Sequence, residues 1–201
     1  MRNKVVLFDF DGTLTTRDTL FAFIVHAKGA WRLCLALLRY APMLMAMRLR
    51  LYDNGMTKQR LFAHFFKGMD AEAFDRLCQA FARDCRDSLL RPQGMAELRR
   101  ALAEGAQVFV VSASIDNWVR PFFATLPQGA LHVVGTQVEA IDGRLTGRFL
   151  TPNCYGAEKV RRIEAVLPLA RAACHVVAFG DSRGDKEMLS YADEAHFKPF
   201  R

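Results

Sequence analysis

The chain has 201 residues and 51% of them are hydrophobic, which allows one sizeable core and excludes a mainly disordered protein. Its five cysteines form no Cys-x-x-Cys pair, so neither a disulfide framework nor a zinc knuckle is expected. The formal net charge of +7 suits an anionic partner such as a phosphorylated small molecule or an acidic membrane surface. Because the sequence contains no recognisable nucleic-acid docking motif, we do not expect a nucleic-acid partner.

The first apolar run carries two carboxylates directly after it. Residues 5–8 have the composition of a buried parallel strand, and Asp9, Asp11, Gly12 and Thr13 follow. Side chains alternate along a strand, so Asp9 and Asp11 are predicted to leave on the same side, where a divalent cation would relieve their repulsion. Gly12 allows close approach to a ligand, and Thr13 offers a hydroxyl and an amide. The alternative is a strand-ending turn in which the carboxylates only bind backbone amides.

The run that contains Asp9 begins close to the N-terminus without a signal-peptide core or a cleavage site, so we expect a cytoplasmic protein. Residues 17–90 then show helical periodicity and almost no strand signal, over a length far greater than one crossover helix needs. We predict a helical cap domain over residues 17–90. Residues 1–16 and 91–201 are predicted to form the core domain.

Within the predicted cap, residues 31–52 are unusually apolar. The segment also contains Arg39, Arg48 and Arg50, which argue against a clear membrane span. Arg32, Arg39 and Arg50 fall on nearly one helical face, a pattern typical of a helix that lies on an anionic bilayer. A peripheral contact with the inner face of the membrane is therefore one interpretation of this segment.

The rest of the chain alternates between strand and helix patterns. Short apolar runs lie at residues 107–112, 131–136 and 175–180, and helical patterns lie at residues 92–103 and 157–167. This alternation predicts an α/β fold with a Rossmann-like parallel sheet.

A small β-hairpin is also predicted within the core. Residues 137–141 and 144–149 flank Asp142 and Gly143, a dipeptide that is strongly favoured in two-residue hairpin turns.

Polar residues stand where the predicted core strands end, and ligands of open α/β sheets collect at that edge. Asp9 and Asp11 follow the first strand, Ser112 ends the second, and residues 180–185 follow the last. Lys159 opens the helix before that last strand. In isolation Ser112 fits a helix N-cap and Lys159 a solvated first-turn residue, but their joint order indicates a catalytic or binding site.

These residues resemble the four motifs of the haloacid dehalogenase superfamily, in order. The motifs are Asp9-Phe10-Asp11-Gly12-Thr13, Ser112, Lys159, and Gly180-Asp181 through Asp185. The resemblance covers the whole chain and has the form of the phosphoserine phosphatase-like branch, subfamily IB, in which a helical cap separates the first two motifs. Asp18 matches an acidic position that contacts substrate in phosphoserine phosphatases, and its alternative role is to cap the first helix of the cap.

The resemblance implies a phosphatase that works through an aspartyl-phosphate. Asp9 would be the nucleophile, and Asp11 would be the general acid for the leaving alcohol and then the base that activates water. Ser112 and Lys159 would hold the transferring phosphoryl oxygens. The substrate-binding residues implied are Gly12, Thr13, Asp18, Ser112 and Lys159.

The resemblance also implies a Mg²⁺ cofactor. The cation would lie among Asp9, the carbonyl of Asp11 and Asp181, with Asp185 in or next to the ligand set. For Asp185 the alternative is that it orients Lys159 instead of contacting the metal.

The resemblance implies a small phosphorylated metabolite as substrate. The layout of the cap is also similar to phosphatidylglycerophosphatase C, a phospholipid-processing member of the same branch, so a lipid head-group phosphatase at the membrane surface is the alternative. With a soluble substrate, the apolar segment of residues 31–52 would have another role. Leu33, Leu37 and Leu44 would then form the cap's own core or the face of a homodimer. A mutase and a non-catalytic phospho-ligand binding module also remain open.

Overall fold

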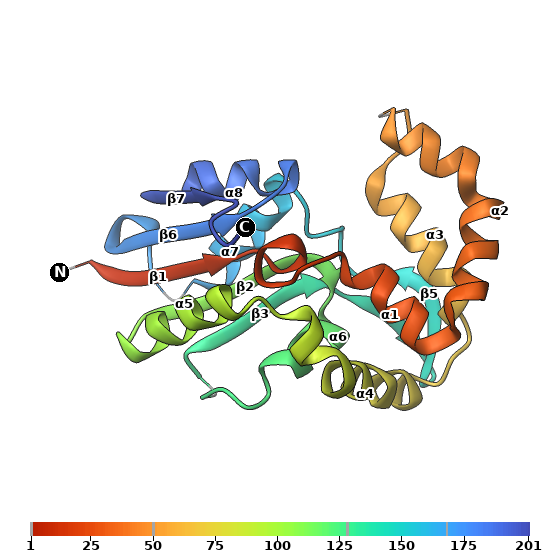
Figure 1. Ribbon diagram of the computed structural model, residues 1–201. Helices are drawn as coiled ribbons and strands as arrows, with labels where there is room; N and C mark the ends of the chain where they lie inside the picture. Colours follow the sequence, from red (N-terminus) through yellow and green to blue (C-terminus); the bar gives the residue numbers. More distant parts are fainter. Residues whose placement is uncertain (1, 50, 128, 168) are drawn as a thin grey trace.

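The computed structural model describes residues 2–49, 51–127, 129–167 and 169–201. Within these residues five parallel strands form the central sheet in the order β3-β2-β1-β6-β7 (Figure 1). Their bounds are β1 Asn3–Phe8, β2 Gln107–Ile115, β3 Leu131–Thr136, β6 Cys174–Gly180 and β7 Glu194–Phe197. The α/β fold with a parallel sheet is confirmed. The edge strand β7 is exposed along its length and has no apolar run, so the sequence does not predict it.

Helices cover both faces of the sheet. Successive side chains of a strand point to opposite faces, so neighbouring residues of β1 pack against different helices. On one face Val6 and Phe8 pack in a core that includes residues of α5 (Pro92–Ala103). On the other, Val5 and Leu7 pack with residues of α7 (Ala157–Val166) and α8 (Lys186–Tyr191). Both faces of β1 are therefore buried, which explains its continuous apolar run.

Among the described residues, four α-helices follow one another between β1 and α5 (Figure 1). They are α1 Thr19–Lys28, α2 Ala30–Arg48, α3 Asn54–Phe66 and α4 Ala71–Leu89. Asp18, Asp53 and Asp70 precede α1, α3 and α4, and each accepts a hydrogen bond from a backbone amide of the first turn. Such N-caps fix where a helix starts.

The chain leaves the sheet for these helices and returns to it at adjacent points. The amide of Thr16 donates to the carbonyl of Leu89 at 2.8 Å, and the amide of Arg91 donates to the carbonyl of Leu14 at 2.8 Å. Thr15 and Leu90 form an isolated antiparallel bridge between these two contacts.

Aromatic side chains join the helices to the sheet. Phe23 of α1 stacks on Trp118 of the short helix α6 (Asp116–Val119), with ring centroids 4.8 Å apart. It also makes edge contacts with Phe74 and Phe81 of α4. Ring pairs of this geometry stabilise a fold beyond the area that they bury, so α1, α4 and α6 are held as one layer.

The predicted hairpin is present as β4 (Val138–Ile141) and β5 (Arg144–Phe149). Asp142 and Gly143 have φ values of 49° and 73°, as a two-residue turn of the expected type requires. The hairpin packs against α3, where a Cβ on Gly147 would lie 2.9 Å from the Cβ of Ala63. The hairpin is thus a separate two-stranded sheet that contacts the inserted helix α3.

Candidate active site

Asp9 lies at the carboxyl end of β1, in the centre of the sheet. Its amide still donates to the carbonyl of Phe179 in β6, at 2.9 Å, and its side chain is buried. The turn Phe10–Leu14 follows, with Gly12 at φ 82°. A Cβ on Gly12 would lie 2.5 Å from Oδ2 of Asp181, so the missing side chain is what lets Asp181 approach the turn.

Lys159 is the centre of a buried ion cluster. Its ammonium donates to Oδ1 of Asp9 at 2.6 Å, to Oδ1 of Asp185 at 2.7 Å and to the carbonyl of Val111 at 2.8 Å. These three bonds use all of its donors. Burial disfavours the charged form of Lys159, but Asp9 and Asp185 outweigh burial and raise its pKa. Lys159 is thus a fixed positive charge beside Asp9.

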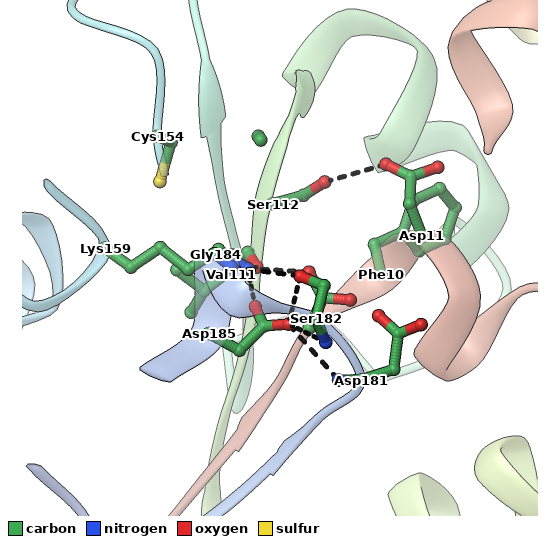
Figure 2. A network of polar contacts seen from close by, with 12 residues as sticks. Phe10, Asp11, Val111, Ser112, Cys154, Lys159, Asp181, Ser182, Gly184 and Asp185 are labelled. Carbon is green, nitrogen blue, oxygen red and sulfur yellow. Dashed lines mark hydrogen bonds and ion pairs between the residues drawn. The ribbon is translucent and has the colours of Figure 1, made fainter. Parts of the chain in front are cut away.

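Both oxygens of Asp185 are engaged, as Figure 2 shows. Oδ1 accepts from Lys159, and Oδ2 accepts from the amides of Asp181 and Ser182 and from the hydroxyl of Ser182, at 3.2, 2.9 and 2.8 Å. Burial opposes the charge of Asp185, but Lys159 and Ser182 lower its pKa below the usual value. The contacts favour the interpretation in which Asp185 orients Lys159.

Asp11 is held by a separate set of contacts. Its Oδ1 accepts from the amide and hydroxyl of Thr19, at 2.7 and 2.6 Å, and its Oδ2 accepts from the hydroxyls of Ser114 and Ser112, at 2.6 and 3.4 Å. In Figure 2 Asp11 lies on the side of Ser112, apart from the group around Lys159 and Asp185. The turn after β1, and not strand alternation as predicted, sets the direction of this carboxylate.

The cluster around Asp9 has the donors that a hard divalent cation requires. One oxygen from each of Asp9, Asp181 and Asp185 lies within 4.8 Å of the others. Oδ2 of Asp9 is buried and has no hydrogen-bond partner in the described part of the chain. Three carboxylates outnumber the one buried ammonium, Lys159, and oxygen ligands of this kind suit Mg²⁺. The residues present therefore fit the ion that the family resemblance implies.

Burial is the main cause of the raised pKa values in this cluster. Burial raises the pKa of Asp9 to about 7, although Lys159 opposes the shift. Burial also raises the pKa of Asp181, and Arg201 opposes it through an ion pair with the carboxylate. Carboxyl groups with raised pKa values in a cluster of this kind are a signature of a functional site.

The other predicted residues occupy three different settings. Ser112 is buried in β2, between Val111 and Ile115, where the pairing with β3 shifts register, and its hydroxyl accepts from the amide of Ser114 at 3.0 Å. Thr13 is buried, and its hydroxyl has no partner among the described residues. Asp18 caps α1, accepting from the amide of Leu20 at 2.8 Å. Capping was the alternative role for Asp18, and a substrate contact remains a prediction.

Sequence reasoning missed Ser114, Thr19 and Arg201. The strand β2 runs to Ile115 and not to residue 112, so Ser114 lies two positions after Ser112 inside the same strand. Strand alternation is the signal that points to Ser114. For Thr19 and Arg201 the sequence offers no comparable signal, because their partners are brought to them by the fold.

Comparisons with known proteins show the family of this chain. The model of the haloacid dehalogenase-like hydrolase family matches residues 6–190. The chain belongs to the haloacid dehalogenase-like hydrolase family. Protein CicA of Caulobacter vibrioides, in strain NA1000 / CB15N, is 38% identical over an alignment 201 residues long, which covers 98% of this chain and 86% of that protein.

The chain also shares its fold with solved structures. A protein of unknown function from Bordetella pertussis Tohama I matches with a TM-score of 0.80 and 22% identity, over 94% of this chain and 87% of that one. A phospho-aspartyl intermediate analogue of phosphoserine phosphatase matches with a TM-score of 0.61 and 21% identity, over 96% and 84% of the two chains. Identities this low show a common fold, which this chain shares with a phosphoserine phosphatase.

Proposed function

We propose that this protein is a Mg²⁺-dependent phosphomonoester hydrolase that acts on a small phosphorylated metabolite through a covalent aspartyl-phosphate. The observation that carries the proposal is the state of Asp9: Oδ1 is bound to Lys159, and Oδ2 is buried without a partner among the described residues. A carboxylate with one fixed oxygen and one free oxygen is a candidate nucleophile. Family membership supports hydrolysis, and several solved structures with this fold are named phosphoserine phosphatases.

In the first step a carboxylate oxygen of Asp9 forms a bond to phosphorus while the bond to the leaving alcohol breaks. Asp11 gives its proton to the leaving oxygen, and in the second step it accepts a proton from the water that cleaves the aspartyl-phosphate. Thr19 and Ser114 fix the direction of Asp11. Ser112 would bind a phosphoryl oxygen, and the fixed positive charge of Lys159 would offset the charge that builds up on these oxygens during transfer.

Asp9, Asp181 and the carbonyl of Asp11 would hold the Mg²⁺ ion. When bound, the ion supplies positive charge that offsets the surplus of carboxylates and the charge of the phosphoryl group. Asp185 contributes by fixing Lys159 between itself and Asp9.

We propose that residues 17–90 act as a cap that selects the substrate. The end of α2 and the start of α3 face the turn after β6 across an open groove of about 730 Å³. Its lining includes Met47, Arg48 and Leu51 from the cap side and Arg183 and Lys186 from the other, together with the acidic residues Asp53 and Glu187. Because this groove has three cations against two carboxylates and is partly apolar, it favours one second candidate function, a phosphatase of lipid head groups at the membrane surface.

The test is phosphate release from a panel of phosphoserine, sugar phosphates, histidinol phosphate and phosphatidylglycerophosphate, with and without Mg²⁺. Asp9→Asn should abolish release and keep phospho-ligand binding, while Asp87→Asn, a matched change at an exposed position, should leave release intact. The preferred substrate distinguishes the two candidate functions. Release that Asp9→Asn does not lower would contradict the proposed mechanism, and no release by wild type would favour a binding module.

A further inference from the structure

The outer side of α2 carries a continuous apolar stripe. Its members are spaced alternately four and three residues apart, so they fall on one side of the helix. We call them the α2 stripe: Trp31, Leu35, Leu38, Pro42, Met45 and, directly after the end of the helix, Leu49. Every member is exposed; Trp31 and Leu38 are 73% and 70% accessible, and Met45 and Leu49 are 65% and 64% accessible. Side chains of this size are rarely left in water in an unbroken row.

The opposite side of α2 is the one that packs against the protein. Leu33 and Ala36 are buried, and Tyr40 makes an edge contact with His64 of α3, with ring centroids 5.5 Å apart. In Figure 1 α2 lies at the end of the molecule remote from β7, with its outer side free of other elements. Leu33 is buried and Leu37 packs against the same core, as expected for part of this segment, but the stripe needs another explanation.

Charge around the stripe has one sign. From Thr19 to Tyr52 the chain has 34 residues and no aspartate or glutamate. Arg32 and Arg39 flank the stripe on one side and Arg48 on the other, and no ion pair in the described residues involves any of the three. Arg50, which the sequence places on the same face as Arg32 and Arg39, lies outside the described residues.

A basic groove lies beside the stripe. Lys28, Arg32, Arg39 and His64 line a hollow of about 380 Å³ together with Leu35, which is itself a member of the stripe. A hollow with several cations and an apolar rim matches a phosphate group that is attached to an acyl chain.

We propose that the α2 stripe docks on the surface of an anionic phospholipid bilayer, with its apolar side chains inserted below the head groups and the flanking arginines at the lipid phosphates. This surface acts independently of the proposed hydrolysis. The helix is long and apolar enough to cross a membrane by length and composition, with a mean hydropathy of 1.2. A span would place Arg39 near mid-membrane and remove Leu33 and Ala36 from their contacts, so a helix in the plane of the interface fits better.

A second copy of the chain fits the same stripe less well. Pairing two stripes would bring the arginines of both copies together, and α2 offers no acidic residue to compensate them. An anionic bilayer supplies the missing negative charge.

The experiment is co-sedimentation of the full chain with vesicles of phosphatidylglycerol and phosphatidylcholine, compared with vesicles of phosphatidylcholine alone, at 50 mM and 500 mM salt. We expect binding to the anionic vesicles that high salt weakens. Leu38→Glu/Met45→Glu should remove it, whereas Val166→Glu, at an exposed apolar position of α7, should not. Arg32→Ala/Arg39→Ala should weaken binding ~30-fold, and Arg76→Ala/Arg99→Ala, the same loss of charge elsewhere, should change it little. Circular dichroism checks that each variant is folded.

Equal binding to both kinds of vesicle, or none to the anionic ones at low salt, overturns the proposal. Sedimentation equilibrium without lipid provides the other decisive outcome. A dimer that Leu38→Glu/Met45→Glu dissociates would assign the stripe to a second copy. Phosphate release from soluble substrates is measured on the same variants, so that a loss of membrane binding can be told apart from a failure of the proposed function.

Discussion

Oγ of Ser114 donates a hydrogen bond of 2.6 Å to Oδ2 of Asp11. Ser114 belongs to the sheet, whereas the other oxygen of Asp11 is held by Thr19, the first residue of α1. Trp118 in turn donates to the hydroxyl of Thr19 at 3.2 Å. The carboxylate proposed as acid and base is thus positioned jointly by the sheet and by the inserted helices.

Ser114→Ala should lower kcat about tenfold with little change in KM, because a hydrogen bond to a charged group contributes about 1.5–3 kcal/mol and Thr19 still holds Asp11. Steady-state kinetics on the preferred substrate measure the effect. Ser114→Thr, which keeps a hydroxyl, should recover most of the rate, and Ser88→Ala at an exposed helical position should have no effect. A lower melting temperature with unchanged kcat would give Ser114 a purely structural role.

Lys159→Met should destabilise the metal-free protein by about 3–5 kcal/mol, because it leaves the buried carboxylates of Asp9 and Asp185 without their cation. Urea denaturation measures the change in the free energy of unfolding. Adding Asp185→Asn should restore part of the loss, since two residues of one cluster are not additive. Lys186→Met, at an exposed position, is the control, and an equal loss there would contradict the ion-cluster explanation.

Gly12→Ala should weaken Mg²⁺ binding more than tenfold, because the new Cβ would meet Oδ2 of Asp181 at 2.5 Å. Gly105→Ala is a matched control: Gly105 has φ +77°, close to the +82° of Gly12, but a Cβ there would meet nothing within 4 Å. Both variants should lose about 1–2 kcal/mol of stability to backbone strain. Isothermal titration with Mg²⁺ separates strain from crowding, and equal Mg²⁺ affinities in the two variants would refute the crowding explanation.

Mg²⁺ should stabilise the fold more at pH 8 than at pH 5.5. Burial raises the pKa of Asp9 from 3.8 to about 7, so at pH 5.5 a proton competes with the ion for this carboxylate. In the metal-free protein, stability changes with pH in the opposite direction. The native state binds the extra proton, so Asp9 makes the fold less stable as pH rises from about 4 to 7. Thermal unfolding with and without Mg²⁺ at the two pH values checks both, using Asp9→Asn to remove the effect.

Much of the fold was predictable from the sequence because its signals are local. The buried strands show as apolar runs, and Asp142 with Gly143 specifies the hairpin turn. The edge strand β7 has no such signal, since its stability comes from pairing with β6 and not from burial.

Part of the candidate site was likewise predictable from the sequence, and part was not. The motif residues around Asp9, Lys159 and Asp185 were predicted to converge, and the structure brings them into direct contact. The position of Asp11 could not be predicted from strand alternation, because β1 ends at Phe8 and the turn takes over. Its partner Thr19 comes from a helix whose placement depends on tertiary packing, which no spacing in the sequence encodes.

The bridge between Thr15 and Leu90 bears on how the chain folds. The central sheet requires Val5 to pair with Gln107, a contact between residues far apart in the sequence. Contacts of this kind are slow to form, because the loop that they close loses conformational entropy. The helices between Thr15 and Leu90 bring their own two ends together, so their formation shortens the loop that the β1–β2 pair still has to close. We therefore expect the insertion to order before or together with the first strand pair.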